Sequence, residues 1–189
     1  MTTEILKDHL NDNLYNKLKD NINYCHISSE NPEDHWKLLF VENQIVLDLG
    51  CGFHMIEPGW MTTPEYFLSK GASQVIGVDP EQKDINILQQ KYPRNLFFCD
   101  TINNTSKLEH YINSYKVTSL KMDIEGDEKY LLLSNDNFST LKYIAIETHS
   151  KSLLNNMIIN LINRNFIINS VCTFYDRVYN ICNLIYANR

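Results

Sequence analysis

The sequence IVLDLGCG at residues 45–52 decides the fold class of this chain. Its first residues are apolar, which predicts a buried strand, and the two glycines that follow predict a tight turn. Because glycine has no Cβ atom, a ligand can lie directly against the backbone of such a turn. A second predicted strand, VIGVDP at residues 75–80, ends in Asp79, an acid placed to hold two ribose hydroxyls. Together the two strands indicate an α/β fold that binds a nucleoside-like cofactor.

Length and charge limit the range of functions. The chain has 189 residues, which is enough for one domain with a sizeable core. Its net charge is −6 and its basic residues are scattered, so nothing indicates a surface for nucleic acid. The N-terminus lacks an apolar signal region, and no apolar run is long enough to span a bilayer. These features predict a cytoplasmic protein that uses neither a membrane nor nucleic acid as partner.

Five cysteines are spaced without any metal-binding or redox pattern. We expect them to be reduced and to pack as small hydrophobic residues, as in a reducing compartment.

Predicted helices and strands alternate through most of the chain. This order predicts a Rossmann-like, doubly wound, mostly parallel sheet of seven strands that ends in a C-terminal antiparallel β-hairpin. Residues 1–43 are expected to form an N-terminal helical arm or lid, and residues 44–189 the core. The predicted strands lie near residues 45–49, 75–79, 95–99, 117–123 and 142–148, with the hairpin at 166–174 and 177–186.

The N-terminal arm has leucines at every fourth position. Leu6, Leu10, Leu14 and Leu18 predict one amphipathic helix over residues 3–22. Its apolar face would either cover the core or contact a substrate or a second copy of the chain, so a homodimer is one expectation.

Acids stand at or near the ends of five predicted strands. In an open α/β sheet, ligands bind at the carboxyl ends of the strands, so these acids are candidate site residues. One or two of them could equally serve as helix caps. They are Asp48, Asp79, Asp100, Asp123 and Glu147.

A second informative stretch is LKMDIEGDEKYLLL at residues 120–133, followed by YIAIETH at residues 143–149. The strand and glycine turn at residues 45–52 resemble the cofactor-binding half of the class I S-adenosylmethionine (SAM)-dependent methyltransferases. The second stretch resembles the K-x-D-x-E-G-x-E signature of the FkbM-like methyltransferases. This resemblance covers roughly residues 44–189 and implies O-methylation of a small hydroxylated acceptor, such as a sugar.

The resemblance also implies which residues bind SAM. Asp48, Gly50 and Gly52 would face the amino acid part of SAM, Asp79 its ribose, and Asp100 its adenine amine. An acidic pocket suits a ligand that carries a sulfonium and an ammonium group. The chain departs from the pattern at His54, where many members of the superfamily have a third glycine.

The acidic stretch and the strand after it contain the candidates for chemistry. Asp123 is the first candidate for a general base or acceptor orienter, and His149 is the second. Glu125 and Glu147 could bind acceptor hydroxyls, whereas Glu128 is expected to face a helix N-terminus. These side chains also include ligand types for Mg²⁺ or Ca²⁺, but their spacing does not require a metal, and we predict none. His35 is expected to be an ordinary packing or surface residue.

Two other functions remain open at this stage. A methyltransferase-like binding or scaffolding protein without turnover would keep the fold, and the short chain and His54 favour that alternative. An RNA 2′-O-methyltransferase would be expected to carry a lysine-rich catalytic set, which the acidic chain fits poorly.

Overall fold

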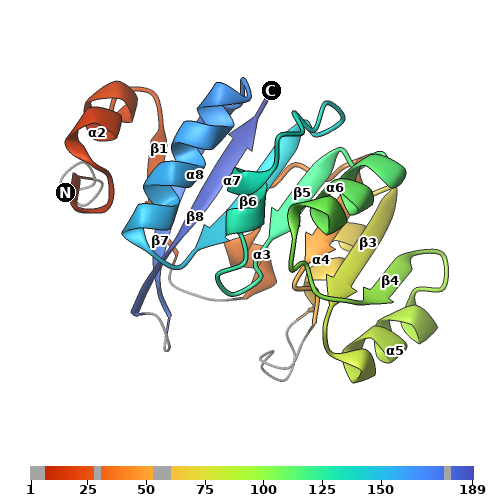
Figure 1. Cartoon of the computed structure of the whole chain (residues 1–189). Helices are drawn as coiled ribbons and strands as arrows, with labels where there is room; N and C mark the ends of the chain where they lie inside the picture. The colour runs from red at the N-terminus through yellow and green to blue at the C-terminus, as the bar shows by residue number, and fades with distance from the viewer. Residues whose placement is uncertain (1–6, 28–30, 53–60, 177–179) are drawn as a thin grey trace.

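The computed structural model describes residues 7–27, 31–52, 61–176 and 180–189, and the strands in these ranges form one sheet (Figure 1). The strand order is β1-β7-β8-β6-β5-β2-β3-β4. Neighbouring strands run parallel except β8, which is antiparallel to both β6 and β7. This arrangement confirms the mostly parallel, doubly wound sheet with a C-terminal hairpin. The strands are β1 (Asn23–His26), β2 (Ile45–Leu49), β3 (Gln74–Asp79), β4 (Leu96–Cys99), β5 (Ser119–Met122), β6 (Tyr143–Thr148), β7 (Ile167–Asp176) and β8 (Asn180–Asn188).

The sheet has eight strands, so the prediction of seven is wrong by one. The additional strand is β1, which pairs in parallel with β7 at the edge of the sheet. Sequence pattern does not reveal β1 because the strand is only four residues long and is followed by a polar segment. The division of the chain at residue 43 stays a prediction.

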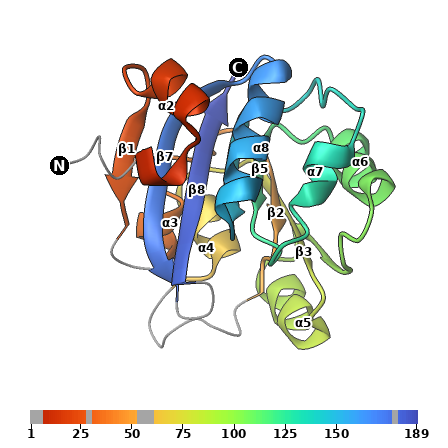
Figure 2. The same cartoon turned by 60° about the vertical axis from the view of Figure 1, so that its left-hand side comes forward.

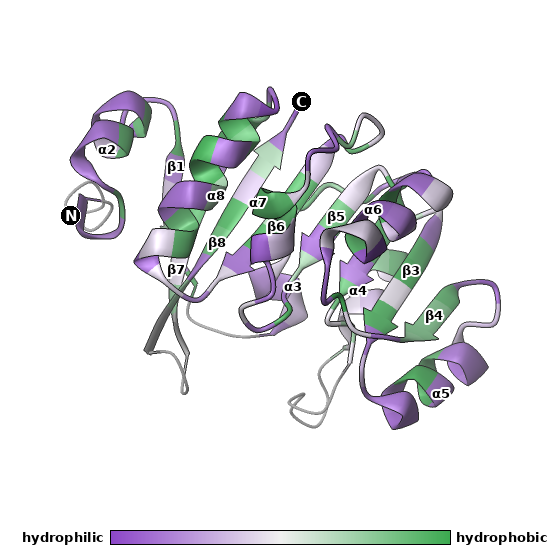
Figure 3. Cartoon of the chain, in the orientation of Figure 1, coloured by the Kyte–Doolittle hydropathy of each residue, from purple (hydrophilic) through white to green (hydrophobic). Residues whose placement is uncertain are grey.

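Helices cover both faces of the sheet (Figures 1 and 2). Buried hydrophobic residues of α6, α7 and α8 belong to one hydrophobic cluster, and buried hydrophobic residues of α4 and α5 belong to a second. Figure 3 shows that hydrophobic residues follow the strands and the inner stripes of the helices. Within the described residues, no helix has the length and apolar character needed to cross a membrane. The helices are α2 (Asp12–Leu18), α3 (Pro32–His35), α4 (Thr63–Ser69), α5 (Gln82–Lys91), α6 (Thr105–Ser114), α7 (Lys129–Leu133) and α8 (Lys151–Asn163).

The N-terminal segment does not form the single helix predicted over residues 3–22. Helix α2 begins after Asn11, whose side chain caps it by accepting a hydrogen bond from the Leu14 amide at 3.0 Å. The Asn11 amide in turn donates to Asn155 on α8 at 2.8 Å, which ties the break to the core. Leu10, Leu14 and Leu18 are buried in the hydrophobic core of the same chain. The leucine face therefore gives no support for a dimer, and Leu6 lies outside the described residues.

Helix α4 is capped at its N-terminus by Thr62. Thr62 and Glu65 form a reciprocal capping box, and Pro64 stands in the first turn. Helix α6 is capped by Asn104, whose side chain accepts a hydrogen bond from the Lys107 amide at 2.9 Å.

A disulfide joins Cys25 on β1 to Cys172 on β7. The parallel register places these two cysteines opposite each other, with their Cα atoms 4.4 Å apart, which is within the range for a disulfide. The expectation that all cysteines are reduced is therefore wrong for this pair. The two residues are 147 positions apart in the sequence, so no local pattern reveals the pairing.

Candidate active site

Five parallel strands end at one edge of the sheet, and a cavity of about 400 Å³ lies there. Four of the five predicted strand-end acids line it: Asp79, Asp100, Asp123 and Glu147. The fifth, Asp48, is fully buried and bonded to Thr63 and Lys121, and both of these residues line the cavity. The sheet therefore brings the predicted acids to one place, as expected for the carboxyl ends of parallel strands.

The glycine turn after β2 lies in close contact with two of these acids. Gly50 has a φ of +76°, and a Cβ atom there would lie 1.9 Å from the Asp123 backbone oxygen. The Gly52 amide donates to Asp79 Oδ2 at 2.8 Å, and a Cβ atom on Gly52 would lie 2.7 Å from that oxygen. Only glycine can therefore bring the turn this close to β3 and to the segment after β5. His54 lies outside the described residues.

Asp79 and Asp100 both line the cavity and accept hydrogen bonds. Asp79 accepts from the Glu81 amide at 2.8 Å as well as from Gly52. Asp100 accepts from the Thr101 amide at 2.8 Å and from the Tyr111 hydroxyl at 3.1 Å, and it pairs with Lys107. Burial alone would raise the pKa of Asp100, but the hydrogen bonds from Lys107, Thr101 and Tyr111 lower it below its usual value. Asp100 is therefore a charged acceptor at neutral pH.

Lys121, on β5, is a buried cation at the floor of the cavity. Its side chain is 1% exposed, and its Nζ lies 3.2 Å from Asp48 Oδ1 and 3.8 Å from Asp123 Oδ2. The same Nζ donates to the backbone oxygens of Leu49 at 3.0 Å and Gly50 at 2.6 Å. Burial alone would lower the pKa of Lys121, but the charges of Asp48 and Asp123 raise it above its usual value. The ammonium is therefore charged and satisfied.

The acidic turn after β5 is shaped by its own last acid. Glu125 and Gly126 have positive φ angles of 56° and 101°, which reverse the chain direction. The fully buried Glu128 accepts hydrogen bonds from the amides of Ile124 and Gly126, both at 3.0 Å. Glu128 precedes α7, as predicted, but its carboxylate fixes the turn in front of the helix rather than the helix itself. The turn thereby holds Asp123 and Glu125 at the cavity.

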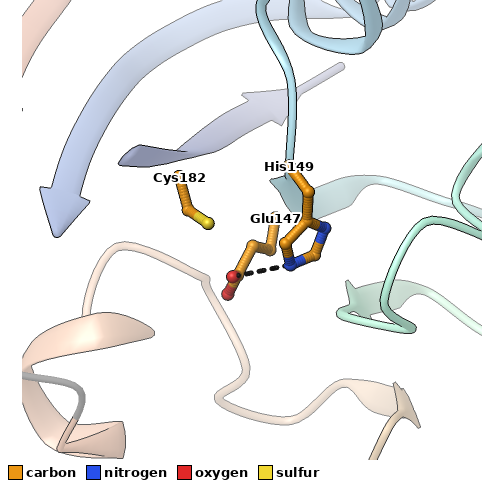
Figure 4. A group of neighbouring side chains, drawn as sticks. All are labelled: Glu147, His149 and Cys182. Carbon is orange, nitrogen blue, oxygen red and sulfur yellow. Dashed lines mark ion pairs between the residues drawn. The ribbon is translucent and has the colours of Figure 1, made fainter. Parts of the chain in front are cut away.

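Glu147, on β6, lies between two histidines. Its Oε2 is 3.1 Å from Nε2 of His35, and its Oε1 is 3.0 Å from Nε2 of His149. Figure 4 shows His149 and Glu147 pointing toward each other, with the buried Cys182 beside them. The imidazole of His149 also faces Glu125 at 3.5 Å and Glu128 at 3.7 Å. His149, directly after β6, therefore places a cation beside the carboxylates of the acidic turn.

These contacts set the charges of the pair. Burial alone would raise the pKa of Glu147, but hydrogen bonds with His149 and His35 lower it to about 2. Burial alone would lower the pKa of His149, but its contacts with Glu128 and Glu147 raise it to about 10. At neutral pH Glu147 is a carboxylate and His149 an imidazolium.

The pair predicts how stability depends on pH. The contribution of His149 is complete below its ordinary pKa of 6.5 and is lost as the pH rises through about 10. The contribution of Glu147 is complete above its ordinary pKa of 4.5 and is lost as the pH falls through about 2. We expect the free energy of unfolding of the wild type to exceed that of His149→Gln by the largest amount between pH 4.5 and 6.5. Above that range, the difference should shrink by less than about 1.4 kcal/mol per pH unit, because water screens part of the interaction. Urea unfolding of both proteins at pH 5.5, 7.5 and 9.5 measures this; a difference independent of pH would contradict the assigned charges.

Asp123 is an acid of the cavity whose neighbours carry both negative and positive charge. Its side chain is 28% exposed and lines the cavity. Burial and the negative charge of Glu147 raise the pKa of Asp123 well above its usual value, although Lys121 opposes the rise. In its ionised form, which the charge of Lys121 favours, a carboxylate of raised pKa is a stronger proton acceptor than an ordinary one.

Two residues of the cavity were missing from the predicted site. Lys121 belongs to the K-x-D-x-E-G-x-E signature but has no role assigned from the sequence. The signal that could have identified it is a lysine inside an otherwise apolar strand. His35 was expected to be an ordinary packing or surface residue, yet it is buried, bonded to Glu147 and lines the cavity. No sequence pattern links His35 to Glu147, because the two are 112 positions apart.

Two groups of side chains have the composition of a metal site. Asp123, Glu125 and His149 offer ligand atoms within 4.8 Å of one another, and so do Glu147, His149 and Cys182 (Figure 4). In both groups His149 already forms ion pairs through Nε2, so a metal would have to displace its proton. The absence of a functional metal stays a prediction.

Comparison with known proteins bears on the fold. No protein-family model and no curated protein matches the chain. Among solved structures, it is similar to Streptococcus pneumoniae Sp1610, a candidate tRNA (m1A22) methyltransferase in complex with SAM, with a TM-score of 0.59 and 10% identity over 85% of this chain and 72% of that one. It is also similar to a SAM-dependent methyltransferase from Mesorhizobium loti, with a TM-score of 0.53 and 14% identity over 84% and 98%. A third is the precorrin-6y C5,15-methyltransferase from Geobacter metallireducens, with a TM-score of 0.52 and 10% identity over 82% and 85%. At these identities the likeness shows a shared Rossmann-like fold and does not show the reaction.

Proposed function

We propose that this protein is a SAM-dependent O-methyltransferase of the FkbM-like type, which methylates a hydroxyl of a small polyhydroxylated acceptor, namely a sugar. The observation that carries the proposal is the cavity that connects the glycine turn and Asp79 to the acidic turn and Asp123. One end of the cavity has the groups that suit a nucleoside cofactor, and the other end has a proton acceptor.

The residues on the cofactor side fit SAM, which supplies a methyl group on a positively charged sulfur. The turn at Gly50 and Gly52 has no Cβ atoms that would separate a ligand from the backbone. Asp79 would accept from the ribose hydroxyls, and Asp100 from the adenine amine. The resemblance implies that Asp48 faces the amino acid part of SAM, but its carboxylate already contacts Thr63 and Lys121. We assign Asp48 an indirect role, in which it holds Lys121 and thereby the glycine turn.

Asp123 is the proposed general base. As the acceptor oxygen bonds to the methyl carbon and the sulfur–carbon bond breaks, Asp123 would take the hydroxyl proton. Asp123 is preferred over His149, because the pKa of about 10 leaves His149 protonated at neutral pH and unable to accept a proton. Alignment of the reacting atoms contributes about 7–11 kcal/mol, and a general base contributes roughly 10²–10⁴ in rate. The site would therefore act mainly by positioning and secondarily through Asp123.

The acceptor side combines an aromatic wall with carboxylates. Pro32, His35, Trp36 and Phe174 line the cavity there together with Glu125, whose side chain is 64% exposed. Glu147 is already bonded to two histidines, so we assign it to orienting His35 and His149 and assign Glu125 to binding acceptor hydroxyls. A sugar has an apolar face for such a wall and hydroxyls for such carboxylates.

An RNA acceptor suits this end of the cavity less well. Asp123, Glu125 and Asp127 line it and would repel a phosphate backbone. A binding protein without turnover is the other alternative, and it would have no need of a general base. Substitution of Asp123 distinguishes the two, because only an enzyme would lose methyl transfer.

Cofactor binding tests the proposal at Asp79. We expect wild-type protein to bind SAM or S-adenosylhomocysteine in the range of about 1 μM to 1 mM typical of enzyme substrates. Asp79→Ala should weaken binding by about 100-fold, because two ribose hydroxyls lose a charged acceptor. Isothermal titration calorimetry measures both affinities, and thermal melting verifies that the variant is folded.

Glu81→Ala is the matched control for this experiment. Glu81 follows Asp79 closely and makes no side-chain cap for α5, so its loss should leave affinity unchanged. Equal affinities of Asp79→Ala and wild type would remove Asp79 from the site, and no binding by folded wild type would overturn the proposed function.

A further inference from the structure

The two sequence stretches that define the site are joined by one side chain, that of Lys121. Its Nζ donates to the Leu49 and Gly50 oxygens at 3.0 and 2.6 Å, and so contacts the glycine turn. The same Nζ lies 3.8 Å from Oδ2 of Asp123, at the start of the acidic turn. These two turns are separated by about 70 residues of sequence. No other lysine among the described residues is so fully buried.

Burial of an apolar residue at position 121 would cost less free energy than burial of a lysine. Lys121 lies in a strand between Leu120 and Met122, both fully buried, and its ammonium has to be removed from water. Asp48 compensates that charge at 3.2 Å, and the Trp36 ring covers it at 5.2 Å. A buried ion pair is weak evidence for a gain in stability. The presence of Lys121 is therefore better explained by the groups that its ammonium holds in place.

We propose that Lys121 is a positioning residue of the methyl transfer, which holds the cofactor turn and the base in one fixed arrangement. The inference rests on the proposed function. Through Gly50, Lys121 fixes the backbone against which the cofactor lies. Through Asp123, it holds the carboxylate at the cavity and favours its ionised form.

The charge of Asp123 depends on four neighbouring groups. Glu125 and Glu147 carry negative charge and favour the protonated acid, whereas Lys121 and His149 carry positive charge and favour the carboxylate. An opposite charge at this distance typically lowers a carboxyl pKa by about 1–3 units. Removal of Lys121 should therefore move the ionisation of Asp123 to higher pH.

The experiment compares wild type, Lys121→Met, Lys121→Arg and the double variant Asp48→Asn/Lys121→Met. The double variant removes both partners of the buried ion pair, so it remains informative if Lys121→Met alone fails to fold. Lys129→Met is the matched control, because Lys129 lies in the same stretch but is 52% exposed and contacts only neighbouring groups among the described residues, the Asp127 carboxylate and the Tyr130 ring.

Three properties are measured in the folded proteins. The first is hydrogen exchange of the amides in residues 45–52 and 119–128. The second is the affinity for S-adenosylhomocysteine, and the third is the pH dependence of kcat with a sugar acceptor identified by screening. The first two are independent of turnover.

If Lys121 positions both turns, amide exchange in the two segments should speed up together at least tenfold in Lys121→Met and in the double variant. The low-pH limb of kcat should move up by about one pH unit, and Lys121→Arg should restore part of both effects. Lys129→Met should match wild type.

The proposal is overturned if exchange stays at the wild-type rate in both segments, or if kcat falls without a shift of the limb. Failure of the proposed function has a different signature, because wild type itself would then neither bind the cofactor nor transfer methyl groups. The exchange measurement would still show whether Lys121 ties the two turns together.

Discussion

Asp123→Asn should lower kcat by about 10²–10⁴ while leaving SAM affinity within about threefold of wild type. The amide of asparagine keeps the shape of the carboxylate but cannot accept the hydroxyl proton. The affinity should be preserved because the groups proposed to hold the ribose and adenine are Asp79, at the end of β3, and Asp100, directly after β4. Initial rates with a radiolabelled methyl donor, together with calorimetry, separate the two effects.

Asp12→Asn is the control for loss of a carboxylate. Asp12 is an exposed residue in the first turn of α2, so both kcat and affinity should be unchanged. Full activity of Asp123→Asn would exclude Asp123 as the base. Loss of SAM binding in that variant would instead place Asp123 in the cofactor site.

Gly50→Ala should destabilise the protein by about 3–5 kcal/mol and remove cofactor binding. The φ of +76° disfavours any residue with a Cβ atom, and that atom would lie 1.9 Å from the Asp123 backbone oxygen. The variant can fold only if the glycine turn moves away from the acidic turn, which would also disturb Lys121.

Gly126→Ala separates backbone strain from steric overlap. Gly126 has a φ of +101°, but a Cβ atom there would have nothing within 4 Å. This variant should lose only about 1–2 kcal/mol. Urea unfolding of both variants measures the difference, and a Gly50→Ala protein as stable as Gly126→Ala would contradict the close contact of the two turns.

Most of the fold could be predicted from the sequence, because the pattern of apolar strands followed by acids is local. Apolar strands followed by acids predicted the ends of β2 to β6, and the sheet brings those ends together. The extra strand β1 was missed, because its pairing with β7 depends on residues far away in the sequence. The Cys25–Cys172 disulfide was missed for the same reason.

The acids of the candidate site and His149 were predicted, whereas Lys121 and His35 were not. Asp79, Asp100, Asp123 and Glu147 could be named, because strand ends are recognisable from periodicity. The partners of Glu147 and Asp48 could not be assigned, because the pairs His35–Glu147 and Lys121–Asp48 exist only after the sheet has formed. The leucine face of the N-terminal segment shows the same limit, since periodicity reveals an apolar face but not what covers it.

A crystal structure with S-adenosylhomocysteine bound would show whether the cofactor and the base share one cavity. We expect the nucleoside to lie over Gly50 and Gly52 with its ribose at Asp79, and the sulfur to face Asp123 with space for an acceptor beside Glu125. A nucleoside bound elsewhere, or a sulfur on the side away from Asp123, would contradict it.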